Sequence, residues 1–90
     1  PMKVDYGIRA LVELAQQTEA GHLSTAEIAK RQEIPEPYLD QLLGTLQKFG
    51  FIRSRRGPQG GHTLAKNPGE INLEMVMNTL EENRSFASGM

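Results

Sequence analysis

A leucine-rich stretch between a proline and a glycine is the feature that most constrains the fold of this 90-residue chain. Its apolar residues recur at the spacing of one helix face: Leu39, Leu42, Leu43, Leu46 and Phe49. Proline is favoured in the first turn of a helix and glycine at its end, so Pro37 and Gly50 mark the limits. The opposite face is then exposed and polar: Asp40, Gln41, Gly44, Thr45 and Lys48. With 38% apolar residues in a chain this short, we expect this helix to anchor one small core.

Further helices are predicted on both sides of this stretch. Apolar spacing predicts one over Val4–Gln17. Ser24 and Glu27 form a capping box, so a second, short helix begins at Thr25. A last helix follows Asn72, which is a good N-cap. In the first helix we expect an apolar face of Ile8, Leu11, Val12 and Ala15, with Tyr6, Ala10 and Leu14 beside it. In the last helix we expect Leu73, Val76, Met77 and Leu80 to form one face.

Two short segments after the leucine-rich helix suit β-strands, Phe51–Arg55 and His62–Lys66. The segment between them, Arg56–Gly61, contains three glycines and a proline, which predicts an exposed turn. The expected fold class is therefore mainly α with a small β-ribbon, a winged helix-turn-helix with a three-helix core, a two-stranded wing and a fourth helix. This domain spans residues 3–81, and residues 82–90 are predicted to be a linker stub or disordered tail.

The charge is distributed unevenly along the chain. The net charge is only −1, but residues 41–66 contain no acidic residue and five bases between acidic flanks. These bases are Lys48, Arg53, Arg55, Arg56 and Lys66. Positive charge concentrated on one part of a small surface is typical of phosphate contacts rather than of general solubility.

The order of the predicted elements places a narrow polar helix beside a basic hairpin, as in winged helices that bind DNA. The major groove admits one helix, in which Gln41 can offer a bidentate amide to adenine and Asp40 can accept from a cytosine amino group. Lys48 is placed for a phosphate. Arg55 and Arg56 suit a phosphate or a narrow minor groove, whose negative potential attracts guanidinium groups.

A family resemblance rests on five segments, found in this order: Tyr6–Leu11, Glu27–Ala29, Tyr38–Leu43, Ser54–Gly61 and Leu64–Ala65. They resemble the winged-helix part of the IscR/NsrR-like bacterial transcription regulators, the Rrf-two family, over about residues 3–81. The resemblance implies a homodimer that binds a two-fold symmetric site on double-stranded DNA, with Arg56 in the minor groove and Tyr38 at the backbone. The candidate DNA-binding residues are then Tyr38, Asp40, Gln41, Lys48, Arg55, Arg56, Gly57, Gln59, Gly60 and Gly61.

The chain also departs from the family pattern. Members typically continue with a cysteine-bearing loop, which in many of them binds an iron–sulfur cluster, and then with a long dimerisation helix. This chain contains no cysteine, so we expect no cofactor in it. We expect either a DNA-binding domain cropped from a longer regulator or a reduced family member. Arg55 replaces a commonly apolar position, and His62 replaces a commonly aromatic one.

Other classes of function find less support. A glycine-rich phosphate loop, a Ser/His/Asp signature and a histidine pair at metal-ligand spacing are all lacking, so we expect no catalysis. Without a run of 18 apolar residues or a signal pattern, we expect a cytoplasmic protein with no membrane partner. The main alternative is a winged helix that binds another protein through an apolar outer face. For single residues, Tyr38 could serve packing, and the arginines could protect a strand edge.

Overall fold

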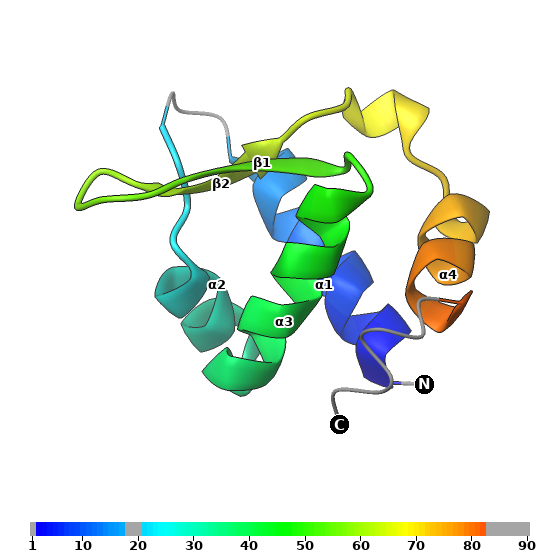
Figure 1. Cartoon of the computed structure of the whole chain (residues 1–90), viewed down its shortest axis with the longest axis horizontal. Coiled ribbons are helices and arrows are strands. Elements are labelled where there is room, and N and C mark those ends of the chain that lie inside the picture. The colour runs from blue at the N-terminus through cyan, green and yellow to red at the C-terminus, as the bar shows by residue number, and fades with distance from the viewer. Residues whose placement is uncertain (1, 18–20, 83–90) are drawn as a thin grey trace.

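The computed structural model describes residues 2–17 and 21–82. Its elements are α1 (Met2–Gln16), α2 (Thr25–Gln32), α3 (Glu36–Lys48), β1 (Ile52–Arg55), β2 (Gly61–Leu64), a 3₁₀ helix η1 (Pro68–Glu70) and α4 (Leu73–Glu82). The hairpin of β1 and β2 lies across one end of α1 and α3, and α4 lies on the far side of α1 from α2 (Figure 1). This arrangement confirms the predicted class, mainly helical with a two-stranded wing. Residues 83–90, most of the expected tail, lie outside the described part, and Glu82 is still helical.

The leucines of α3 form the centre of the core, as predicted. Leu39, Leu42, Leu43 and Leu46 are all buried. The prediction was wrong for Phe49, which is 48% exposed. Helix α3 ends there, and Gly50 has a φ of 84°, so the chain turns and buries Phe51 instead.

The predicted apolar face of α1 was wrong in part. The buried residues are Val4, Gly7, Ala10, Leu11 and Leu14, whereas Val12 and Ala15 are exposed and Ile8 is half-buried. The buried face of α1 includes Gly7 because α4 packs against α1 at this residue. A Cβ atom at Gly7 would collide with the Leu80 side chain, so the missing side chain allows the two helices to approach closely.

Helix α4 begins after Asn72, as expected, and the Asn72 side chain accepts a hydrogen bond from the Met75 backbone N–H at 2.8 Å. Val76 and Leu80 are buried, as predicted. Leu73 and Met77 were predicted to share that face but are exposed. Met75 is half-buried beside Val76 and packs against the core.

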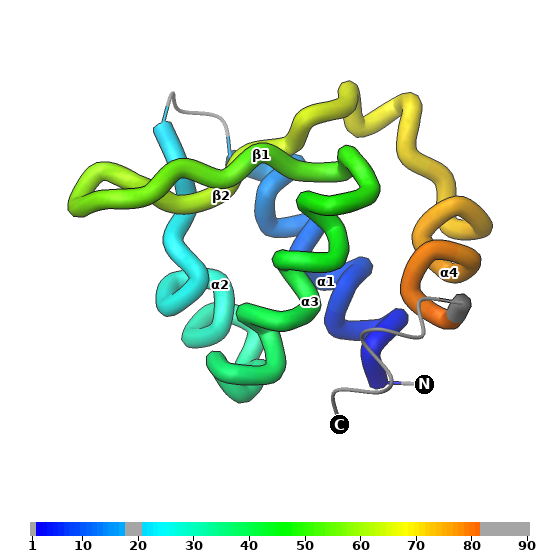
Figure 2. The backbone as a smooth tube through the Cα atoms, viewed as in Figure 1, coloured from blue at the N-terminus to red at the C-terminus, as the bar shows by residue number. Residues whose placement is uncertain are grey.

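The wing is an antiparallel hairpin in which Ile52 pairs with Leu64 and Arg55 pairs with Gly61. Ile52 is buried, Leu64 is half-buried, and β2 begins one residue earlier than expected. The segment before α2 crosses the hairpin (Figure 2), where Leu23 and His62 exchange two backbone hydrogen bonds of 3.0 and 2.8 Å. The base of the wing is thereby attached to the chain that leads into α2.

Candidate nucleic-acid interface

The exposed face of α3 is polar and narrow. Asp40, Gln41, Gly44 and Lys48 are exposed, as the sequence predicts. Thr45 was predicted to lie on the same face, but it is buried, and its hydroxyl donates to the Gln41 carbonyl at 3.3 Å. A Cβ atom on Gly44 would have no heavy atom within 4 Å. The middle of this face therefore has open space where another body could approach the helix backbone.

The turn between α2 and α3 fixes the angle at which this face is presented. Glu33 adopts a left-handed conformation with a φ of 54°, and Ile34 is buried and donates its backbone N–H to the Ala29 carbonyl. Helix α3 then begins at Glu36, with Pro37 in its first turn, as predicted. The buried Ile34 thus anchors a tight turn between the two helices.

Tyr38 stands at the N-terminal end of α3 and is half-buried. Its ring makes an edge-on contact with the ring of Tyr6 on α1, with centroids 5.7 Å apart. Burial, and then the charge of the nearby Tyr6, raise the pKa of Tyr38 above its usual value, so its hydroxyl keeps its proton near neutral pH. The guanidinium of Arg9 lies 5.7 Å from the centre of the Tyr6 ring, which places a cation beside the pair. The packing interpretation of Tyr38 is confirmed, and a phosphate contact stays a prediction.

The arginines of the wing are exposed and unpaired. In the part of the chain that the structure describes, Arg9 and Arg31 form ion pairs, and no arginine of the wing does. Arg53, Arg55 and Arg56 all lie in solvent, together with Gly57 and Gln59 at the tip of the wing. The wing therefore carries positive charge that no carboxylate of the described residues neutralises through an ion pair.

Gly60 and Gly61 are half-buried, and the fold itself requires glycine at both positions. A Cβ atom on Gly60 would collide with the Arg55 carbonyl. Gly61 has a φ of 141°, and a Cβ atom there would lie 2.7 Å from the backbone of Leu23. The pair of glycines thus lets the wing turn tightly and lie against the chain before α2.

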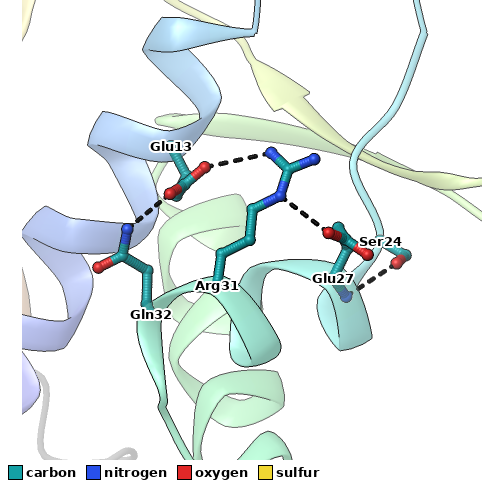
Figure 3. A network of polar contacts seen from close by, with 5 residues as sticks. All are labelled: Glu13, Ser24, Glu27, Arg31 and Gln32. Atoms are coloured by element: carbon teal, nitrogen blue, oxygen red, sulfur yellow. Dashed lines mark hydrogen bonds and ion pairs between the residues drawn. The ribbon is translucent and has the colours of Figure 1, made fainter.

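A polar network holds α2 against α1 (Figure 3). Arg31 donates to Glu27 at 2.8 Å and to Glu13 at 3.3 Å, and Gln32 donates to the other oxygen of Glu13 at 2.6 Å. The hydrogen bonds to Glu27 and then Glu13 raise the pKa of Arg31 above its usual value. At the other end of α2, Ser24 accepts from the Glu27 backbone N–H at 3.1 Å, which is the Ser24 half of the predicted capping box, whereas the Glu27 carboxylate accepts from Arg31. The i, i+4 pair was readable from the sequence, but the link to Glu13 was not.

His62 is a polar residue whose role sequence reasoning missed. Its Nε2 atom lies 2.7 Å from the Thr25 hydroxyl, and its Nδ1 atom lies 2.7 Å from the Ser54 hydroxyl. Burial lowers the pKa of His62 below its usual 6.5. The carboxylate of Asp40 opposes this shift, and His22 adds to it. The ring therefore connects the wing, through Ser54, with α2, through Thr25.

The wing and the start of α3 lie on the same side of the molecule. In Figure 1 the tip of the wing extends past α2 on the left, and the N-terminal end of α3 lies lower, beside α2. Helix α4 lies on the right, at the other end of the molecule from the wing tip. The wing and the N-terminal end of α3 thus lie toward the side of the molecule that carries α2, away from α4 (Figure 1). None of the helices in residues 2–17 and 21–82 has the length and apolar content required to cross a membrane.

Known proteins of similar sequence and structure are bacterial regulators. The Synechocystis sp. protein slr0846 is 44% identical over 80 residues, which cover 89% of this chain and 54% of that protein. The HTH-type transcriptional regulator IscR of Pectobacterium atrosepticum is 39% identical over 77 residues, covering 86% and 47%. Among solved structures, CymR, the global cysteine regulator of B. subtilis, superposes with a TM-score of 0.84 at 33% identity, covering 90% of this chain and 63% of that one. The chain spans about half the length of the curated relatives that it matches.

The family model that matches is Rrf2, described as an iron-dependent transcriptional regulator, and the match extends over residues 2–89. Iron sites in proteins are built from clustered cysteine, histidine or carboxylate ligands. The chain has no cysteine, and within the described residues no three His, Asp or Glu side chains come together as metal ligands. This part of the chain therefore does not fit an iron site, although sequence and fold match over almost its whole length. The chain belongs to the Rrf2 family of transcriptional regulators.

Proposed function

We propose that this chain is a sequence-specific DNA-binding module of a transcription regulator, with the exposed face of α3 in the major groove and the wing at the adjacent minor groove. The observation that carries this proposal is the pairing of a polar α3 face with an unpaired cationic wing on one side of the fold. A single helix fits the major groove, and the negative potential of a narrow minor groove attracts guanidinium groups.

The roles of the residues follow from where they lie. Gln41 and Asp40 are exposed near the start of α3, where side chains reach base edges. Lys48, at the other end of α3, suits a phosphate, although its ammonium also lies 5.8 Å from the centre of the Phe49 ring. Tyr38 has a protonated hydroxyl that suits a phosphate oxygen. The proposed wing contacts are Arg55, Arg56, Gly57, Gln59, Gly60 and Gly61.

We further propose that two copies bind together on a two-fold symmetric site, with half-sites about one or two helical turns apart. One small module covers only a limited area of DNA, so a second copy is needed for tight and specific binding. The alternative, a protein-binding winged helix, would use an apolar outer face on α3. Apart from Phe49 at its end, the exposed face of α3 is polar, which favours DNA.

The test is selection of duplexes from a random DNA pool with the wild-type chain and with Gln41→Ala. We expect the wild type to enrich one defined sequence. The variant should lose discrimination of about 1–3 kcal/mol at a single base pair, because a bidentate amide contact reads one base. Gln16→Ala, which removes an exposed glutamine from α1, is the matched control and should leave the preference unchanged. Failure of the wild type to enrich any sequence would contradict sequence-specific binding, and an unchanged preference in Gln41→Ala would remove the role of that residue.

A further inference from the structure

The imidazole of His62 lies at the junction of two elements that the proposed function uses. It is hydrogen-bonded on both ring nitrogens, to Thr25 at the first position of α2 and to Ser54 on β1, each at 2.7 Å. The wing and α2 thus meet around one side chain.

The two hydrogen bonds connect different parts of the fold. Ser54 is the cross-strand partner of His62, so that bond lies within the wing. The bond to Thr25 joins the wing to α2. Helix α2 is itself held to α1 by the Glu13–Arg31 contact, so the bond to Thr25 attaches the wing to a fixed point. The backbone pairing of His62 with Leu23 lies directly beside it.

A free two-stranded hairpin has little stability of its own, so contacts at its base must set its direction. β1 contributes little to these contacts, because Arg53, Ser54 and Arg55 are exposed and only Ile52 is buried. β2 contributes more, because it is half-buried along its length and the His62 backbone pairs with Leu23. Among them, the bond from His62 to Thr25 is a side-chain contact of defined direction, because an imidazole nitrogen has a single lone pair or proton in the ring plane.

We propose that His62 is a positioning residue, which holds the wing at a fixed angle to α2 and α3 so that the arginines of the wing and the face of α3 reach the same duplex. This inference rests on the proposed function. The contact with DNA belongs to Arg55, Arg56 and α3, and His62 acts through them.

Two substitutions test the hydrogen bonds of His62 separately, one for the bond to Thr25 on α2 and one for the bond to Ser54 within the wing. Thr25→Val removes the hydroxyl that faces Nε2 and keeps the shape of the side chain. Ser54→Ala removes only the partner of Nδ1, and the backbone ladder still pairs β1 with β2. His62→Phe keeps a ring and removes both bonds, whereas His62→Gln carries an amide that can reach the position of Nε2 and serves as the rescue variant.

Binding is measured by fluorescence anisotropy on the duplex that the wild type selects, at several salt concentrations. Thr25→Val should bind about three- to tenfold more weakly, as expected for one lost hydrogen bond. His62→Phe should bind at least as weakly, because it loses the same bond together with the bond to Ser54. Their salt dependence should fall by about one phosphate contact, because a misdirected wing no longer reaches the backbone. Ser54→Ala and His62→Gln should stay within about twofold of the wild type. Hydroxyl-radical footprints of Thr25→Val should lose protection opposite the wing and keep it opposite α3.

An NMR measurement without DNA makes the result independent of the proposed function. The orientation of the wing relative to α2, from residual dipolar couplings of backbone amides, should spread in Thr25→Val and stay fixed in Ser54→Ala. If the wild type binds DNA and Thr25→Val shows the same affinity, salt dependence and footprint, the positioning role is refuted while DNA binding stands. If the wild type does not bind DNA, the proposed function fails, and unchanged couplings in Thr25→Val would then also overturn the claim that His62 holds the wing.

Discussion

The charge of the wing gives the most quantitative prediction, tested by the double variant Arg55→Ala/Arg56→Ala. Four exposed bases lie along α3 and the wing without a carboxylate partner in the described residues: Lys48, Arg53, Arg55 and Arg56. Each phosphate contact contributes about 0.9 to the slope of log affinity against log salt. If all four contact phosphates, the slope is about −3.6 for each bound chain, and removing two arginines lowers its magnitude to about 1.8.

These slopes translate into a large difference over an accessible range of salt. Between 50 and 200 mM salt the wild type should lose about 150-fold in affinity for each bound chain, and the double variant only about 12-fold. The assay is fluorescence anisotropy on the selected duplex, with the affinity measured at four or more salt concentrations. Because counterion release and not base recognition produces the slope, the same change should appear on duplexes of unrelated sequence.

Lys30→Ala is the control, because it removes an exposed positive charge from the last turn of α2 and none from the wing. It should leave the slope within experimental error of the wild type. A slope that the double arginine variant does not change would refute the placement of the wing on the DNA backbone. An equal drop in Lys30→Ala would show that net charge, and not the position of the wing, controls binding.

Three further predictions concern stability, measured by urea unfolding. Leu46→Ala should cost about 2–5 kcal/mol, because it leaves a cavity at a fully buried position. Gly7→Ala should destabilise the fold by about 1 kcal/mol or more, since the new methyl group collides with the Leu80 side chain. Gly44→Ala should stabilise it by about 0.5–1 kcal/mol, because the space around Gly44 is open and alanine favours a helix. An opposite order for the two glycines would contradict the packing of α1 against α4. The lowered pKa of His62 means that the unfolded chain binds its proton first as the pH falls. The resulting stabilisation is full above about pH 6.5 and is lost as the pH falls through the folded-state pKa, and His62→Phe should flatten this part of the profile.

Local signals predicted the elements well and their faces less well. The N-cap at Ser24, the proline in the first turn of α3 and the glycine after it all act within one turn of backbone, and all three were confirmed. Of the capping box predicted at Ser24 and Glu27, only the Ser24 half was confirmed, because the Glu27 carboxylate accepts from Arg31. Phe49 and Thr45 were assigned to the wrong faces of α3. Helical spacing gives the direction of a side chain but not how far the neighbouring element extends over it. Spacing alone therefore cannot decide whether a residue at the edge of a face or at a helix end is buried or exposed.

For the candidate interface, too, some features were set by the sequence and others by the tertiary structure. The sequence by itself determined that an acid-free basic segment follows a helix with one polar face, because charge and period are properties of consecutive residues. Only the tertiary structure decided which bases stay unpaired and what holds them. Arg31 finds Glu13 and His62 finds Thr25 across 18 and 37 positions of the chain, and such contacts depend on the angles at which helices and hairpin pack. Those angles come from the burial of side chains from every element at once, which no local pattern records.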